Sequence, residues 1–403
     1  MKFLIMTLLM AVLTNLTPEV IHLNEFEDSN KAKAPKQANP FDDEKGTKAK
    51  CRTEFTFTRG EAPIRLPVTF KGREFFFMLD TGSSSTVFDV LFKHELGKPK
   101  SLVEVKTTSD SMVVQTFDAL PAFVGPFSMQ NCGEVTCLNL KMLTLIAGKE
   151  ISGLIGMNFL RKHVLQIDFN NGRLILLKTL KEKNFDWGEE FTISFNSLGL
   201  PQIKGNVLGY IKTDFTIDTG SIATGTLDRR IFEEILSKEN LITSETLAST
   251  ASGLVKSKTA RIDRLSIGSF EYQDLIFSEG DVNNLGLDFL SRHLITFDFP
   301  NNKIYLKEGK EFLKMDESDM SGLHLLRISN EIVVHSVDKG SPAAKAGIRA
   351  GDIILKVEGK NADEYEMWVL RRLLRFGDEY KITMTIKHGN DKQEIFFLLR
   401  KKI

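Results

Sequence analysis

The stretch FMLDTGSSSTVF at residues 77–88 carries an apolar run directly into an aspartate, Asp80, and then into small, turn-forming residues. Alone, such a segment predicts a strand followed by a tight loop, because Asp and Gly favour turns. The same phrase returns 138 residues later (218 minus 80) as FTIDTGSIATGTL at residues 215–227, with Asp218 in the place of Asp80. We therefore interpret the two stretches as equivalent loops of a repeated structural unit.

The repeat continues after each aspartate. Apolar residues at helical spacing predict that each loop leads into a helix. These residues are Phe88, Leu91, Phe92 and Leu96 in the first copy and Leu227, Ile231, Ile235 and Leu236 in the second. Further on, residues 119–131 parallel residues 261–274 as a strand, a Gly-containing turn and a strand. The closest match joins residues 154–177 with residues 284–306, which predict a short helical start and then a hairpin.

The repeated order of elements predicts the domain organisation. Short strands between turn signals dominate both copies, which indicates a mainly β fold with one lobe used twice. We expect a first lobe at residues 52–185, a second lobe at residues 186–310 and a different module at residues 320–403. The chain has 403 residues, of which 42% are hydrophobic, so it can bury a core in each part.

Charge and the N-terminal region bear on the environment of the protein. The 53 basic residues balance 53 acidic ones, so no global field attracts the chain to nucleic acid. Residues 1–20 contain an early lysine and an apolar run too short to span a bilayer, which predicts a signal peptide, or a membrane anchor if it stays uncleaved. Residues 21–51 predict a disordered linker or pro-segment. We expect an exported protein that is periplasmic, at the cell surface or secreted.

The paired aspartates predict acid–base chemistry. If a pseudo-twofold axis relates the two lobes, Asp80 and Asp218 meet at their interface. Two carboxylates about 3 Å apart cannot both ionise, so they share one proton. The ionised carboxylate then takes a proton from a bound water while the protonated one polarises a carbonyl, which suits hydrolysis of an amide. We predict that this pair is catalytic, that the substrate is a polypeptide, and that no metal or other cofactor takes part.

The rest of each Asp-Thr-Gly-Ser phrase is expected to support its aspartate. The glycine allows a sharp turn and leaves backbone N–H groups near the carboxylate. The threonine can hydrogen-bond across the lobe interface, and the serine can donate its hydroxyl to the outer carboxylate oxygen, which favours the ionised form and activity on the acidic side. These supporting residues are Thr81, Gly82, Ser83, Thr219, Gly220 and Ser221.

Two apolar residues before Asp-Thr-Gly-Ser, with a later apolar-apolar-Gly-x-Asn/Asp-Phe-Leu segment, resemble the pepsin/retropepsin clan of aspartic peptidases in its bacterial retropepsin-like form. The resemblance covers about residues 52–307. It implies two acid-protease barrels and an aspartic endopeptidase with Asp80 and Asp218 as the catalytic pair. It also implies that the segments around Gly156 and Gly286 pack beneath the aspartate loops.

The same resemblance places substrate-covering flaps at the polar hairpins of residues 105–116 and 247–259. Neither hairpin contains the tyrosine of pepsin-type enzymes. Asn158 stands where an aspartate is frequent in the family, and we expect this change in the packing around the loop to leave the chemistry intact.

The C-terminal module follows another pattern. A turn and a short helix after Pro342, a strand, an amphipathic helix from Asp363 and two closing strands resemble a PDZ domain of the kind appended to bacterial envelope proteases. The resemblance implies a groove between the strand from Leu323 and that helix, where an extended peptide adds as a strand, often held by its C-terminal carboxylate. The carboxylate loop would contain Gly322, Leu323, His324 and Leu325.

Several alternatives stay open at this point. The lobes could be catalytically degenerate and the chain an envelope adaptor that binds peptides through its PDZ domain, although intact Asp-Thr-Gly-Ser in both copies argues against this. The PDZ-like module could only pack on the second lobe. The peptidase could act on its own chain or on one partner. Cys132 and Cys137 could form a disulfide that leaves Cys51 unpaired, and the sequence leaves other pairings open.

Overall fold

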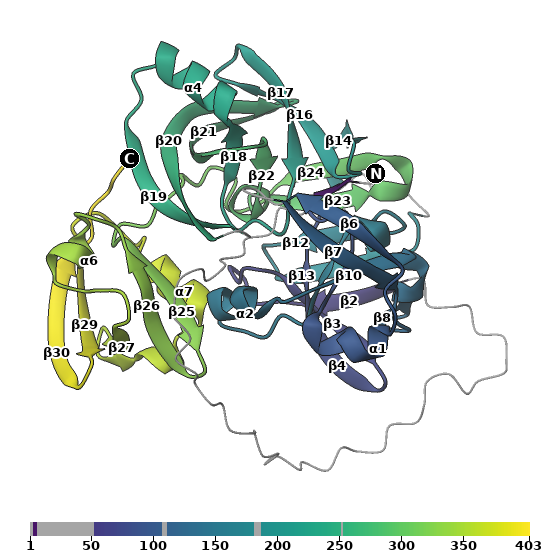
Figure 1. Ribbon diagram of the computed structural model, residues 1–403. Coiled ribbons are helices and arrows are strands. Elements are labelled where there is room, and N and C mark those ends of the chain that lie inside the picture. Colours follow the sequence, from purple (N-terminus) through teal and green to yellow (C-terminus); the bar gives the residue numbers. More distant parts are fainter. Residues whose placement is uncertain (1–2, 6–51, 107–110, 181–186, 251–252) are drawn as a thin grey trace.

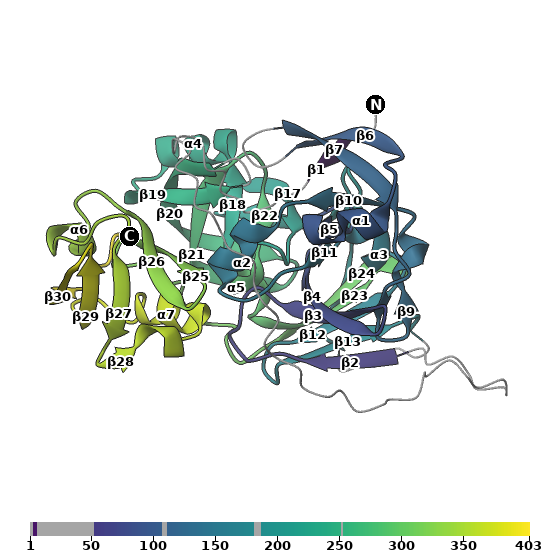
Figure 2. The same ribbon diagram turned by 60° about the horizontal axis from the view of Figure 1, so that its bottom comes forward.

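The computed structural model describes residues 3–5, 52–106, 111–180, 187–250 and 253–403, and the elements in these ranges confirm the mainly β class (Figure 1). Two barrel-like lobes lie side by side, and the C-terminal module packs against both (Figures 1 and 2). The predicted signal peptide and the segment of residues 21–51 lie outside the described residues, apart from Phe3–Ile5, which form β1 and pair with β6. No helix in the described part of the chain is long and apolar enough to cross a membrane.

The first lobe is a ten-stranded sheet in the order β1-β6-β7-β10-β5-β11-β4-β3-β8-β9. Its helices α1 (Lys93–Leu96), α2 (Lys141–Ala147) and α3 (Met157–Leu160) are short. The strands are β1 (Phe3–Ile5), β3 (Arg65–Phe70), β4 (Arg73–Leu79), β5 (Val87–Asp89), β6 (Ser101–Lys106), β7 (Ser111–Asp118), β8 (Phe123–Val124), β9 (Phe127–Ser128), β10 (Glu134–Leu138) and β11 (Gly153–Ile155).

The second lobe repeats this plan in eight strands, ordered β15-β16-β17-β22-β18-β21-β20-β19. It contains the helices α4 (Arg229–Lys238) and α5 (Leu287–Leu290). The strands are β15 (Ser194–Phe195), β16 (Pro201–Val207), β17 (Ile211–Ile217), β18 (Gly225–Asp228), β19 (Thr243–Thr250), β20 (Gly253–Ile267), β21 (Phe270–Gly280) and β22 (Asn284–Leu285). Both predicted flaps are hairpins, β6–β7 and β19–β20, whose tips at residues 107–110 and 251–252 lie outside the described residues.

The two lobes share a six-stranded sheet in the order β14-β24-β23-β12-β13-β2. At its centre β12 pairs antiparallel with β23, with Gln166 opposite Thr296 and a hydrogen bond of 2.9 Å between their side chains. This pairing relates one lobe to the other by an approximate twofold axis. The strands are β2 (Arg52–Thr56), β12 (Val164–Asp168), β13 (Arg173–Leu177), β14 (Glu189–Thr192), β23 (His293–Asp298) and β24 (Lys303–Glu308).

The helices that follow the aspartate loops begin later than their apolar spacing predicts. Phe88 and Leu227 belong to the strands β5 and β18, and helical turns begin only at Val90 and Arg229. The reason is the residue at each helix start, because Asp89 and Asp228 accept hydrogen bonds from the N–H groups two residues ahead and cap the first turn.

The apolar residues just before Asp80 belong to β4, which lies inside the first lobe. This strand lies between β3 and β11 in the sheet, and its residues are buried on both faces, with Phe77 and Leu79 in one hydrophobic cluster and Met78 in another. The Phe77 ring packs edge-on against Phe88, which returns the chain to the same core, with 5.1 Å between ring centroids. Asp80 therefore lies at the end of a rigid, doubly covered strand.

The C-terminal module is a separate sheet in the order β25-β26-β27-β29-β30, with β28 beside β27 and its own hydrophobic core. The predicted helix after Pro342 is present as α6, and the amphipathic helix α7 begins at Met367, four residues later than expected, because residues 362–364 form a 3-10 turn. The elements are β25 (Leu323–Ile328), β26 (Glu331–Val337), α6 (Pro342–Lys345), β27 (Ile353–Val357), β28 (Lys360–Asn361), α7 (Met367–Leu373), β29 (Lys381–His388) and β30 (Asp391–Leu398).

Candidate active site

Asp80 and Asp218 occupy equivalent positions at the ends of β4 and β17. The N–H of Asp80 donates to Ile155 O on β11 (3.1 Å), and the N–H of Asp218 donates to Leu285 O on β22 (2.9 Å). Each loop is thus anchored by the strand that follows it much later in the same lobe. Both aspartates have no solvent-exposed surface, so the lobes enclose the pair completely.

Gly82 and Gly220 show that the two carboxylates face each other. A Cβ atom at Gly82 would overlap the carboxylate of Asp218, and one at Gly220 would overlap the carboxylate of Asp80. Each loop therefore turns a bare glycine toward the aspartate of the other lobe. The N–H of each glycine donates to Oδ1 of its own aspartate at 2.9 Å. As predicted, the glycines place backbone donors at the carboxylates, and they also leave the space that the opposite carboxylate fills.

Thr81 and Thr219 join the loops across the interface, as their positions predict. The N–H of Thr81 donates to Oγ1 of Thr219 and the N–H of Thr219 donates to Oγ1 of Thr81, both at 3.0 Å. Their hydroxyls donate in turn to backbone oxygens of the opposite strand, Thr81 to Ile217 O (2.6 Å) and Thr219 to Leu79 O (3.1 Å). Four buried hydrogen bonds thus fix the distance between the two aspartate loops.

The serines act differently from the prediction. The hydroxyl of Ser83 donates to Ser85 O at 2.7 Å, within its own loop, instead of to a carboxylate oxygen. Ser221 reaches Asp218 through its backbone N–H, which donates to Oδ1 at 3.1 Å. The tight turn directs the Ser83 side chain toward Ser85 and away from the carboxylate. The Ser83 hydroxyl therefore does not stabilise the ionised form of Asp80, which was the reason for expecting activity at acidic pH.

Asn284 is a polar neighbour of the pair that the sequence reasoning missed. Its Nδ2 donates to Oδ2 of Asp218 at 3.3 Å, while its Oδ1 accepts from the N–H of Thr226 at 2.8 Å, which fixes the orientation of the amide. Leu154 occupies the equivalent place in the first lobe, and Oδ2 of Asp80 has no hydrogen-bond partner among the described residues. A comparison of the two closing segments would have shown that Asn284 stands where the first copy has Leu154.

Burial raises the pKa values of both aspartates, and repulsion by Asp218 adds to the rise at Asp80. The pKa of Asp80 lies well above its usual value because the group is desolvated and because Asp218 lies nearby. Desolvation raises the pKa of Asp218 to about 7, and hydrogen bonds from Gly220, Ser221 and Asn284 oppose the rise. The additional hydrogen bond from Asn284 favours Asp218 as the ionised member of the pair.

The closing segments pack beneath the aspartate loops. A Cβ atom at Gly156 would overlap Ser85 O, and one at Gly286 would overlap Ala223 O, so neither position has room for a side chain. Asn158 accepts hydrogen bonds from both the N–H (2.7 Å) and the hydroxyl (2.8 Å) of Thr86, which confirms that an amide is accommodated there.

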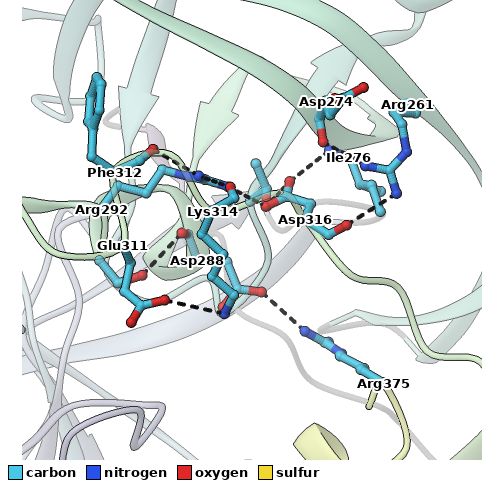
Figure 3. A network of polar contacts seen from close by, with 12 residues as sticks. Arg261, Asp274, Ile276, Asp288, Arg292, Glu311, Phe312, Lys314, Asp316 and Arg375 are labelled. Atoms are coloured by element: carbon cyan, nitrogen blue, oxygen red, sulfur yellow. Dashed lines mark hydrogen bonds and ion pairs between the residues drawn. The ribbon is translucent and has the colours of Figure 1, made fainter. Parts of the chain in front are cut away.

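In the second lobe a residue from the following segment takes over this contact. The hydroxyl of Thr224, the counterpart of Thr86, donates to Asp316 at 2.6 Å. Asp316 also forms an ion pair with Arg292 at 2.6 Å (Figure 3). Asp288, the counterpart of Asn158, instead forms an ion pair with Arg375 of the C-terminal module at 3.2 Å. The segment that joins the second lobe to the PDZ-like module thus contacts the Asp218 loop through the hydrogen bond between Asp316 and Thr224.

The predicted carboxylate loop of the C-terminal module has its donors engaged. The N–H groups of Ser321 and Gly322 donate to Oδ1 of Asp319 (3.0 and 2.5 Å), and the N–H of Leu323 donates to the Ser321 hydroxyl (3.0 Å). His324 pairs with Asp338 at 2.9 Å. Leu323 and Leu325 are buried in the core of the module. These contacts oppose the capture of a peptide carboxylate in the conformation described.

The cysteines and possible metal sites were the other candidates. Cys132 and Cys137 are free thiols, so the disulfide considered from their spacing is wrong, and Cys51 lies outside the described residues. Burial raises the pKa of Cys132 to about 11. The described residues contain no group of three or more His, Cys, Asp or Glu side chains placed to hold a metal ion.

Comparison with known families agrees with this architecture. Residues 66–159 match the family described as aspartyl protease, and residues 333–387 match the family described as PDZ domain. The chain therefore carries an aspartyl protease domain followed by a PDZ domain, and the resemblance predicted from the motifs is confirmed.

Similarity to individual proteins is local. A probable CtpA-like serine protease of Staphylococcus aureus (strain COL) is 31% identical over 74 residues, which is 18% of this chain and 15% of that protein. Its counterpart in Staphylococcus saprophyticus is 32% identical over 91 residues, 22% of this chain and 18% of the relative. The matched region thus spans less than a fifth of these curated relatives.

Two solved structures are also similar in part. A photosystem II D1 C-terminal processing protease shares 25% identity at a TM-score of 0.20, over 21% of this chain and 23% of its own. A retropepsin-like aspartic protease from Rickettsia conorii shares 21% identity at a TM-score of 0.23, over 29% of this chain and 88% of its own.

Proposed function

We propose that the protein is an aspartic endopeptidase whose single active site is formed by Asp80 and Asp218. The observation that carries this proposal is the reciprocal fit of the loops, in which each glycine opens onto the aspartate of the other lobe. The crossed threonine hydrogen bonds support it, because they join the two aspartate loops directly across the lobe interface. A degenerate scaffold would have no reason to keep these contacts on both sides.

The unequal hydrogen bonding of the two aspartates supports an assignment of the shared proton to Asp80. Asp218, stabilised by one donor more than Asp80, is the carboxylate, and Asp80 is the acid. A water held between them loses a proton to Asp218 as its oxygen attacks the peptide carbonyl carbon, and Asp80 donates its proton to the carbonyl oxygen. The tetrahedral intermediate then collapses: one of its two hydroxyl groups returns a proton to Asp80 as the carbonyl re-forms, the C–N bond breaks and the leaving amine takes the proton from Asp218. Each of the two steps moves two protons, and the pair ends with the single proton on Asp80 with which it began.

Access to this pair requires a conformational change. Both carboxyl groups are fully buried, whereas a peptide that is cleaved must contact them directly. The flap hairpins β6–β7 and β19–β20 are the elements that the family resemblance assigns to substrate covering, and we propose that they open to admit an extended polypeptide.

The decisive experiment compares three Asp-to-Asn variants in the digestion of a denatured protein between pH 4 and pH 8. Asp80→Asn and Asp218→Asn are each expected to lower the rate of cleavage by at least about a thousandfold while the chain stays folded. Asp281→Asn changes an exposed aspartate of the second lobe and should leave the rate unchanged. Near-full activity in either active-site variant would rule out the shared pair.

Export is a separate part of the proposal. The apolar run in residues 1–20 supports a signal peptide, with the periplasm, the cell surface or the medium as the destination. N-terminal sequencing of the active protein tests this, because the mature chain is expected to start near residue 20 and so to lack β1 at the edge of the first sheet. A start beyond residue 50 would instead identify residues 21–51 as a removable pro-segment.

A further inference from the structure

The edge strand of the PDZ domain lies against the protease part of the chain. β25 pairs only with β26 among the described strands, so its other edge is open to addition of a strand. Helix α2 of the first lobe lies in contact with both β25 and α7 (Figures 1 and 2). The groove expected to receive a peptide therefore contains a helix from the same chain.

The contact is apolar at its centre. Met142 on α2 and Leu326 on β25 bury each other, and Leu145 and Ile146 pack against this pair. Residues 142, 145 and 146 follow the i, i+3, i+4 spacing of one helix face, which is how an amphipathic helix anchors in a groove. The end of the helix is equally close, because a Cβ atom at Gly148 would overlap the side chain of Met367 at the start of α7.

Arg371 on α7 fastens the helix end to the open edge of the sheet. Its Nη2 donates to Ile146 O at 2.5 Å and reaches Leu325 O on β25 at 3.5 Å. Lys149, just beyond α2, forms an ion pair with Glu366 at 3.2 Å. A peptide strand added along β25 would need the backbone edge that these contacts cover.

Another face of α2 packs into a buried cluster of the first lobe that includes the base of the first flap and also Met78 on β4 and Leu154 on β11. Leu143 and Ala147 pack in one buried cluster with Val105 of β6 and Val114 of β7. The same short helix thus fills the PDZ groove on one side and supports the base of the β6–β7 hairpin on the other. A displacement of α2 from the groove would therefore weaken the packing at the base of the β6–β7 hairpin.

We propose that α2 is the resident ligand of the PDZ groove, and that an incoming peptide with an apolar i, i+3, i+4 face displaces it and loosens the first flap. The PDZ domain then acts as a sensor on the protease lobe, because the occupant of its groove sets the freedom of the hairpin that covers the aspartates. This coupling is independent of the catalytic assignment, since it concerns binding and motion alone.

The test uses the full chain and a fluorescein-labelled peptide of residues 139–150, NLKMLTLIAGKE, which copies the resident helix. All proteins carry Asp218→Asn, so that the probe is not cleaved. Met142→Asp places a charge in the buried contact and weakens the resident helix without altering the groove. We expect the probe to bind this variant about tenfold or more tightly than the parent protein. Lys141→Asp adds a carboxylate at the exposed neighbouring position and should leave binding unchanged.

Hydrogen exchange of residues 101–106 and 111–118 is the second readout. The amide protons of β6 and β7 should exchange about tenfold or more faster in Met142→Asp than in Lys141→Asp. Equal probe binding by parent and Met142→Asp would show that α2 does not occupy the groove in solution. Tighter probe binding with unchanged exchange would show that the groove is not coupled to the flap. Either result overturns the proposal.

A milder pair of variants guards against misfolding. Gly148→Ala would bring a methyl group into Met367, whereas Gly72→Ala, in the turn between β3 and β4, has a similar positive φ (73° against 69°) and nothing within 4 Å of the new methyl. The first should increase probe binding and the second should not, although both place an alanine at a positive φ. Equal behaviour of the two variants would also contradict the proposal.

Discussion

The amide nitrogen of Asn284 lies 3.3 Å from Oδ2 of Asp218, and this contact makes the two halves of a nearly symmetric site unequal. Without it, the two aspartates would have matching glycine, threonine and strand contacts. The amide donates to the ionised form of Asp218 and has no counterpart at Asp80, where Leu154 stands in the equivalent place. The asymmetry of the proposed mechanism therefore depends on one side chain outside the Asp-Thr-Gly-Ser phrases.

Asn284→Leu is expected to shift the pH dependence of cleavage. Loss of a donor to the carboxylate raises the pKa of Asp218 above its value of about 7, so the acidic limb of kcat/KM moves up by about one pH unit. The pH profile of kcat/KM on a peptide substrate measures this shift. Asn131→Leu, at an exposed asparagine of the first lobe, is the control. An unmoved acidic limb would show that Asn284 does not stabilise the ionised pair.

Stability should depend on pH through the same carboxyl group. The pKa of Asp218 is raised on folding, so the folded protein binds this proton more tightly than the unfolded chain, and stability falls as pH rises from about 4 toward 7. Asp218→Asn removes the buried charge and is expected to exceed the wild type by about 2–4 kcal/mol at pH 8, with no difference near pH 3. Denaturant unfolding at several pH values measures the effect. A constant difference across this range would contradict the assignment.

The crossed threonines should contribute strongly to stability. Thr81→Val keeps the shape of the side chain but leaves the N–H of Thr219 and the carbonyl of Ile217 buried without this partner. We expect a loss of about 2–4 kcal/mol in the free energy of unfolding and a lower rate of cleavage. Thr81→Ser keeps the hydroxyl and should lose much less. If both variants unfold alike, the methyl group and not the hydrogen bonds would hold the loops together.

Asp316 should matter for the second lobe although it lies outside the repeat. Asp316→Ala leaves Arg292, which is 3% exposed, without its ion pair and Thr224 without its acceptor. A broken buried pair costs about 3–5 kcal/mol, and we expect a loss in this range in thermal or denaturant unfolding. Glu317→Ala, at the exposed neighbouring residue, should change stability by less than about 0.5 kcal/mol.

A double variant separates the two contributions at this site. Arg292→Met combined with Asp316→Ala removes both charges, so it should recover a large part of the loss caused by Asp316→Ala alone. Strictly additive losses would mean that the two side chains act independently, and that the ion pair does not support the Asp218 loop.

The parts of the site that could be predicted are those written in local sequence. The repeated phrase located Asp80 and Asp218, and its glycines and threonines have the contacts that their chemistry required. The hairpins and the order of elements followed from turn residues and period-2 patterns. The prediction for the Ser83 hydroxyl was wrong. In a tight loop a hydroxyl can donate to a nearby backbone oxygen, here Ser85 O, and the sequence does not give the rotamer that decides between acceptors.

The missed features are all contacts between distant segments. The pairing of β12 with β23 joins segments 130 residues apart, and neither strand has a sequence pattern that identifies its partner. Asp316 appeared as one charge in a charged bridge, and only the fold brings it to Thr224. Helix α2 was expected neither as a helix nor as a partner of the C-terminal module, since its apolar face is too short to stand out by periodicity.

The strand pairing of β12 with β23 resembles the isologous contact of a homodimer, but here both partners belong to one polypeptide. In a homodimer every position occurs twice with the same residue, so an asparagine at one aspartate would bring a second asparagine to the other. Duplication within a single chain removes this restriction. It lets Leu154 and Asn284 differ at matching places, and it lets one C-terminal module touch the first half through α2 and the second through the segment containing Asp316, where a symmetric assembly would need two modules.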